Sequence, residues 1–188
     1  MKNSDYMRNI LLILFMFVFS FSLISGADDS LQNTPEFSAK VKAVFIFNML
    51  KYVQWPDDSA ISSYDIVILG ESSIARPLQK IAETRSVNKK PLRIRLEQNI
   101  EQIQNCHVLF ISSTVEPQIN GILKTLEQRH ILTIGDLEGL GARGVIINFI
   151  LVEGKIKFEI NSQAAKRASL QLSSQLLKLA KLVHDDKG

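Results

Sequence analysis

The chain has 188 residues, of which 46% are hydrophobic and 22% charged, and its formal net charge is +3 at pH 7. This length fits one domain with a sizeable core, and so small a net charge argues against a role in binding nucleic acid or lipid. Cys106 is the only cysteine, which excludes an intramolecular disulfide and leaves one unpaired thiol.

Residues 1–27 are predicted to form a cleaved secretory signal peptide. Lys2 and Arg8 precede an almost wholly apolar run at residues 10–24, and the small residues at 25–27 suit a signal peptidase. The apolar run is shorter than the ~20 residues of a membrane-spanning helix, so cleavage is favoured over retention as an anchor. We expect residues 28–34 to form a flexible N-terminal arm and residues 35–188 to form a single domain.

A helix is predicted to begin at Thr34-Pro35, because threonine caps free N–H groups and proline suits the first turn. It should end near residue 52 or 53, before Trp55-Pro56. Its second half is apolar nearly all round, so it needs cover on a second side, from the C-terminal helix, a second subunit or a partner. Trp55 either anchors a partner or seals the helix end against the core.

Strands and helices then alternate. Continuous apolar runs predict buried parallel strands at residues 65–69, 107–112 and 130–134, and alternating residues predict a half-exposed edge strand at 92–96. The start of the second buried strand is also where Cys106 lies, which favours a small buried hydrophobic side chain over a reactive thiol. Helices are expected at residues 77–85, at 99–104 as a short turn, and after the capping-box sequence 113–116.

Two strands at residues 145–152 and 155–160 are expected to form a hairpin around Glu153-Gly154. Asn148 and Glu159 should pair across it. The whole pattern predicts an α/β fold with three layers, in which a mainly parallel sheet of flavodoxin-like order 2-1-3-4 carries a C-terminal antiparallel hairpin and flanking helices. A helical tail is expected after the hairpin, with Asn161 as its cap and a stripe formed by Leu172, Leu176, Leu179, Ala180 and Val183.

The glycines Gly139, Gly141 and Gly144 form a literal GxGxxG. A dinucleotide site requires a helix to open on the last glycine, so that its free N–H groups face the pyrophosphate. Here residues 145–150 are β-branched and aromatic, which predicts a strand and argues against nucleotide binding.

No catalytic motif is visible, and none of the three histidines has a metal-ligand neighbour at the usual spacing. We therefore predict no catalytic residue, no cofactor and no metal site. Asp136 and Glu138 follow the strand at 130–134, where α/β proteins bind ligands, so they form either a weak ligand site or a solvated loop. Arg143 either contacts a partner or pairs with Asp136 or Glu138.

Three parts of the chain match a known family in the same order. They are residues 41–56, residues 106–112, and a third part with Ile134-Gly135-Asp136, Ile147-Asn148-Phe149 and Phe158-Glu159-Ile160-Asn161. With these segments the chain resembles the YfiR-like family of periplasmic proteins. The resemblance implies a non-enzymatic, periplasmic inhibitor of a membrane diguanylate cyclase. It also implies a glycine near Ser169 that breaks the tail into two helices, and a partner for Cys106 near Val67, where this chain has no cysteine.

The predicted function follows from this resemblance. A homodimer in the periplasm would bind the sensor region of an inner-membrane diguanylate cyclase and lower cyclic di-GMP synthesis, without a stable membrane anchor or nucleic-acid partner. The alternative is a periplasmic small-ligand-binding module serving a receptor or transporter, with a pocket around Gly70, Ser112 and Asp136. An electron carrier is disfavoured because no phosphate-binding loop follows the first strand. The predicted partner-binding residues are Phe45, Met49, Tyr52, Trp55, Asp136, Glu138, Arg143, Leu176 and Leu179.

Overall fold

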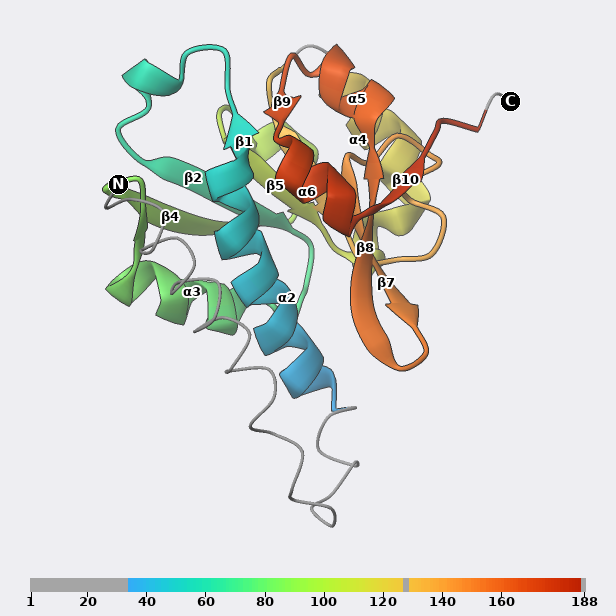
Figure 1. The fold of residues 1–188 in the computed structure, drawn as a ribbon. Coiled ribbons are helices and arrows are strands. Elements are labelled where there is room, and N and C mark those ends of the chain that lie inside the picture. Colours follow the sequence, from blue (N-terminus) through green and yellow to red (C-terminus); the bar gives the residue numbers. More distant parts are fainter. Residues whose placement is uncertain (1–33, 127–128, 187–188) are drawn as a thin grey trace, which may run out of the picture. The chain divides into compact units, whose positions relative to one another are not determined.

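A computed structural model of the protein describes residues 34–126 and 129–186 (Figure 1). The predicted signal peptide and all but the last residue of the predicted arm lie outside the described residues. The described residues belong to one compact unit that begins at Thr34. Within them, no helix combines the length and the apolar character that crossing a membrane requires.

An eight-stranded sheet forms the middle layer, with the strand order β10-β8-β7-β6-β5-β2-β4-β3. Its central four strands are parallel neighbours, and in chain order they read 2-1-3-4, so the predicted flavodoxin-like order is confirmed. The predicted edge strand, residues 92–96, pairs on one side only, with β2, and the short strand β3 pairs with the two residues that precede it, Lys90 and Pro91. The central strands are β2 (Tyr64–Leu69), β4 (Lys90–Glu97), β5 (Val108–Ile111) and β6 (Leu132–Gly135).

The predicted hairpin extends this sheet. β7 (Ile147–Val152) runs parallel to β6, and β8 (Lys155–Asn161) runs antiparallel to β7. Glu153 and Gly154 both have a positive φ, as a two-residue hairpin turn requires. Two short strands were not predicted from the sequence. β10 (Lys181–Val183) pairs with β8, and β3 (Ser86–Val87) pairs with β4.

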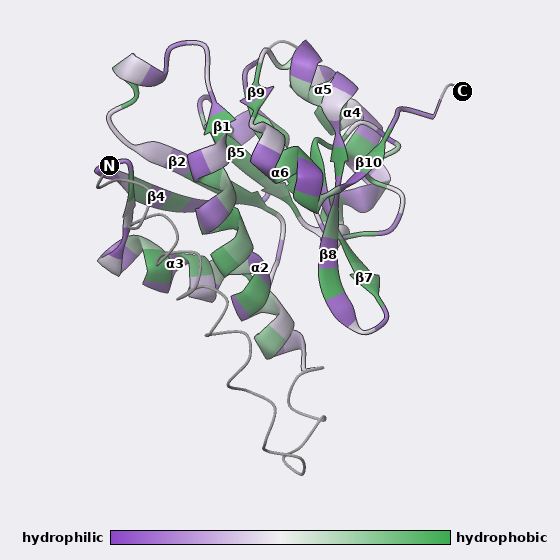
Figure 2. Cartoon of the chain, viewed as in Figure 1, coloured by the Kyte–Doolittle hydropathy of each residue, from purple (hydrophilic) through white to green (hydrophobic). Residues whose placement is uncertain are grey.

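Helices cover both faces of the sheet. Side chains alternate along β2, so Ile66 and Ile68 belong to one core and Val67 and Leu69 to the other. Figure 2 shows hydrophobic residues along most of β7, whereas β4 mixes hydrophobic and hydrophilic residues. The first core contains residues of α2 (Pro35–Met49), α3 (Ala75–Thr84) and α6 (Ser174–Leu179). The second contains residues of the 3-10 helix η4 (Ser113–Gln118) and of α4 (Ile119–Thr125), and one, Ile103, that directly follows η3 (Ile100–Gln102).

The first helix begins as predicted, because the Thr34 hydroxyl accepts the N–H of Phe37 at 3.2 Å. α2 ends at Met49 and continues as the 3-10 helix η1 (Leu50–Tyr52) and the short strand β1 (Val53–Gln54). The hairpin covers part of the second apolar side of α2. The Phe45 ring centroid lies 6.1 and 6.0 Å from the ring centroids of Phe149 and Phe158. Val44 on the same helix stays exposed.

The predicted helical tail is two short helices and not one, with the break at Ser169 that the family resemblance implies. Asn161 does cap it, accepting the Ala164 N–H at 2.9 Å, but α5 (Ser162–Arg167) then ends. Ser169 has a φ of 57°, and the N–H groups of Ser169 and Leu170 donate back to Lys166 and Ala165, both at 2.9 Å. These bonds form a Schellman motif, which satisfies the last carbonyls and stops a helix. The chain continues through β9 (Gln171–Leu172), which pairs with β1, before α6 and β10.

The helix predicted to begin at the capping-box sequence 113–116 is capped one residue earlier than expected. Ser112, rather than Ser113, is the cap: its hydroxyl accepts the Thr114 N–H at 3.3 Å. Pro117 lies inside the 3-10 helix η4, and the regular helix begins only at Ile119. A proline lacks the N–H that an α-helix needs, which accounts for the later start.

Replacing Ser169 with glycine is expected to stabilise the protein by about 0.5–1 kcal/mol, because a left-handed backbone is costly for a residue with a Cβ atom. Urea unfolding of both proteins would measure the change. Lys166→Gly, at an exposed position inside α5, is the control and should lower stability by about 1 kcal/mol. An equal loss in both variants would contradict the role assigned to Ser169.

Candidate functional site

The C-terminal end of the first helix divides into buried and exposed residues. Met49 and Trp55 are 3% and 4% exposed. The Trp55 ring packs against Tyr64 and His107, with centroids 5.4 and 6.1 Å away. Both residues are thus packed in the core, whereas Tyr52 is exposed at the same helix end.

The short helix α6 lies beside the end of α2 (Figure 1). The β1–β9 pairing sets this placement, and the Ser173 N–H donates to the Tyr52 carbonyl at 2.9 Å. Leu176 turns into the core, but Leu179 is 74% exposed. We call the exposed set of Val44, Tyr52 and Leu179 the α2–α6 surface.

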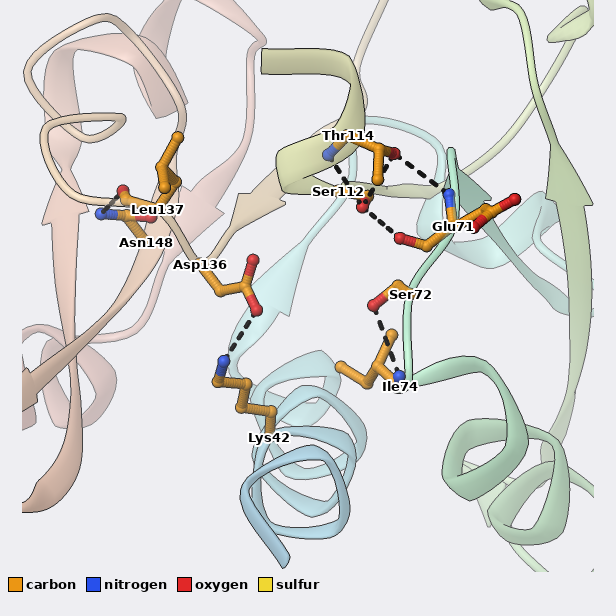
Figure 3. A network of polar contacts seen from close by, with 9 residues as sticks. All are labelled: Lys42, Glu71, Ser72, Ile74, Ser112, Thr114, Asp136, Leu137 and Asn148. Carbon is orange, nitrogen blue, oxygen red and sulfur yellow. Dashed lines mark hydrogen bonds and ion pairs between the residues drawn. The ribbon is translucent and has the colours of Figure 1, made fainter. Parts of the chain in front are cut away.

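The loop at residues 136–144 does not gather its charges at one point. Asp136 forms an ion pair with Lys42 of α2, with an Nζ–Oδ2 distance of 2.7 Å, as Figure 3 shows. Arg143 pairs instead with Glu116, and its Nη2 lies 3.3 Å from the Asn120 Oδ1. The predicted pairing of Arg143 with Asp136 or Glu138 is therefore wrong. Glu138 is exposed.

The glycines of the loop serve packing and turning. A Cβ on Gly141 would come within 3.0 Å of the Glu159 Oε2 and the Val183 Cγ2, so a glycine lets the loop lie against β8 and β10. Gly139 and Gly144 have φ values of 80° and 104°. The chain after Gly144 enters β7 and no helix, which agrees with the prediction against a dinucleotide site.

The predicted pairing across the hairpin is confirmed. Asn148 and Glu159 are opposite each other in the β7–β8 ladder, and the Asn148 Nδ2 lies 3.5 Å from the Glu159 Oε2. The same nitrogen donates to the Leu137 carbonyl at 2.9 Å, tying the loop to the hairpin. Lys181 of β10 completes the group with a 3.0 Å contact to the Glu159 Oε1.

The C-terminal ends of β2 and β5 are joined by hydrogen bonds (Figure 3). The Ser112 hydroxyl donates to the Glu71 carbonyl, and the Glu71 N–H donates to the Thr114 Oγ1 at 3.2 Å. Gly70 has a φ of 83°, and a Cβ there would collide with the Thr114 hydroxyl. The hydroxyl groups of Ser112 and Thr114 are thus used within the chain, and Asp136, the third residue of the predicted pocket, lines a separate cavity with Ser38 and Lys42.

Comparison with known proteins assigns the chain to a family. A family model described as YfiR/HmsC-like matches residues 39–181, which is most of the chain. The chain belongs to the YfiR/HmsC-like family. This family is periplasmic and regulatory rather than catalytic, and membership in it suggests a regulator of a diguanylate cyclase. No curated protein matches the chain.

A solved structure supports the fold assigned to this YfiR/HmsC-like chain. It is a conserved domain protein from Vibrio cholerae O1 biovar eltor str. N16961, with a TM-score of 0.54 and 15% sequence identity. The match covers 77% of this chain and 59% of the Vibrio chain, so the two share a fold over part of the larger protein.

Two half-buried titratable side chains, Cys106 and His107, lie next to Trp55 in the YfiR/HmsC-like domain. Burial raises the pKa of the Cys106 thiol to about 12, which leaves little thiolate near neutral pH. Burial also lowers the pKa of His107, whose Nδ1 accepts the Asp65 N–H at 3.0 Å. Across residues 34–126 and 129–186, no three His, Cys, Asp or Glu side chains are placed to hold a metal ion.

Sequence reasoning did not single out Val44. Its neighbours in the apolar half of α2 are nearly all hydrophobic, so the pattern alone does not separate the exposed side chain from the buried ones. Which side chains of α2 are buried is decided by the packing of α3, α6 and the hairpin against this helix.

Proposed function

We propose that this protein is a periplasmic negative regulator that binds the sensor region of an inner-membrane diguanylate cyclase and lowers cyclic di-GMP synthesis. The observation that carries the proposal is the family match over residues 39–181. The proposal includes export by residues 1–27 and action as a folded domain.

The α2–α6 surface is the contact region that we propose. It displays an exposed aliphatic side chain on each of two helices, Val44 on α2 and Leu179 on α6, and the amphipathic ring of Tyr52 at the end of η1. Burial of such side chains supplies most of the free energy at protein interfaces, and tyrosine is enriched among the residues that contribute most. Phe45 is half-buried and packs against Phe149 of the hairpin, which helps to hold the exposed side of α2 in place.

The carboxylate of Glu138 supplies a polar contact in the same proposal. It is exposed on the loop after β6, so it is free to meet a basic side chain of the sensor. Asp136 and Arg143 already form ion pairs within the domain, so their contribution is to hold this loop in place. Met49, Trp55 and Leu176 are buried, and they act by shaping the helices that carry the surface.

Inhibition requires that the domain bind the inactive cyclase more tightly than the active one, because a ligand shifts an equilibrium only by its differential affinity. A difference of about 2.7 kcal/mol in binding free energy changes the ratio of active to inactive enzyme about 100-fold. Release of the domain would then restore cyclase activity.

The test is intracellular cyclic di-GMP in strains that lack the gene and strains that carry it again with or without residues 1–27. The proposal predicts a rise on deletion that only the form with residues 1–27 reverses. Reversal by the form without these residues would refute periplasmic action, and unchanged cyclic di-GMP on deletion would refute cyclase inhibition.

A further inference from the structure

A pocket of about 370 Å³ lies between α4 and α5, apart from the α2–α6 surface. Its size is within the range of small-molecule sites, which are concave and mostly apolar with a few convergent polar groups. α4 packs on the opposite face of the sheet from α2. The apolar walls are formed by Leu123, Leu126, Ile131, Ile146, Ala164 and Ala168.

Three cationic side chains line the same pocket: Lys124 on α4, Arg143 on the loop and Arg167 on α5. None of its lining residues is acidic. Lys124 makes no ion pair with any residue that the structure describes. Glu116 and Asp185 balance the charges of the two arginines, so the pocket has an excess positive charge from Lys124, which has no ion-pair partner in the described part of the chain.

Both arginines keep free donors although they are paired. Arg143 uses Nη1 for Glu116 and Nη2 for Asn120, and Arg167 uses the same two nitrogens for Asp185. A guanidinium has five N–H donors, so each arginine retains some for an anion. Their acidic partners also hold the two guanidinium groups in fixed positions, which lowers the entropy cost of binding.

Thr133 adds a polar group at the pocket. Its side chain is buried, and its Oγ1 accepts the Ile146 N–H at 2.9 Å. The hydroxyl proton has no acceptor among residues 34–126 and 129–186, so it remains to be donated. A hydroxyl donor among aliphatic side chains fixes the orientation of a small ligand.

We propose that this pocket binds a small organic anion with a compact apolar body and one carboxylate or phosphate group. The apolar body lies between the aliphatic side chains of α4 and α5. The anionic group faces Lys124, Arg143 and Arg167. An inorganic anion would leave the apolar walls in contact with water, and a neutral compound would leave Lys124 without an ion-pair partner, so the site favours a ligand that has both an apolar body and an anionic group.

Calorimetric titration of the purified protein tests this with four probes: phenylphosphate, phenylacetate, benzyl alcohol and inorganic phosphate. We expect saturable binding of at least one of the two aryl anions, at least about tenfold tighter than benzyl alcohol or inorganic phosphate. Comparison of phenylphosphate with phenylacetate distinguishes a phosphate ligand from a carboxylate ligand. Absence of saturable binding by both aryl anions would overturn the proposal.

Three variants locate the site. Lys124→Glu should weaken the aryl anion about tenfold or more, and Ala168→Leu should block the pocket. Lys166→Glu, an exposed charge reversal on α5 outside the lining, should leave the affinity within about threefold of the original. Equal weakening by Lys124→Glu and Lys166→Glu would show a non-local charge effect and refute the site. If Ala168→Leu fails to fold by circular dichroism, the two lysine variants decide the result.

Discussion

Replacing Leu179 with aspartate is expected to raise intracellular cyclic di-GMP to the level of a strain that lacks the gene. The side chain is 74% exposed, so the substitution costs the folded domain little. In a complex, the new carboxylate would be buried without a partner, which costs about 3 kcal/mol and weakens binding about 100-fold. Cyclic di-GMP extracted from cells that export the variant at normal levels gives the result.

Leu151→Asp is the matched control for this variant. Leu151 is 71% exposed near the tip of the β7–β8 hairpin, outside the α2–α6 surface. The control should keep cyclic di-GMP low, and both variants should unfold at the temperature of the original protein. If Leu179→Asp represses as well as the original protein does, the α2–α6 surface is not the contact region.

Replacing Trp55 with alanine is expected to destabilise the domain by about 3–5 kcal/mol, because it removes a large buried ring. The ring fills the space between the end of α2 and the sheet, where it meets Tyr64 and His107. Urea denaturation followed by circular dichroism measures the loss.

Trp55→Phe separates a packing role from a binding role. The phenyl ring keeps much of the contact and removes the indole N–H, which has no hydrogen-bond acceptor in the described part of the chain. We expect a loss of about 1–2 kcal/mol and unchanged repression of the cyclase. Loss of repression in a stably folded Trp55→Phe protein would instead mean that Trp55 contacts the partner directly.

The central sheet was predictable because its local signals agree with its tertiary environment. The run at residues 65–69 is β-branched and apolar, and both of its faces are in fact covered by helices. Glu153-Gly154 sets the register of the hairpin, so the opposition of Asn148 and Glu159 followed from counting residues.

The structure of residues 162–183 and the ion pairs of the 136–144 loop were less predictable, because contacts between distant parts of the chain determine both. A serine at position 169 gives no local signal for a left-handed residue, and β9 is too short to be recognised without its partner β1. Arg143 meets Glu116 only because the loop after β6 folds back against η4. Charge patterns along the sequence favoured the nearer acids, Asp136 and Glu138.

The pairing of the first and last parts of the domain has a consequence for folding. β1 requires β9, and the Phe45 ring requires Phe149 and Phe158, more than a hundred residues later in the chain. Such contacts of large sequence separation make folding slow, because the loop must close before any of them forms. The side of α2 that faces the hairpin therefore stays uncovered until residues 149–158 have been made, so this side is an aggregation-prone surface of the partly synthesised chain.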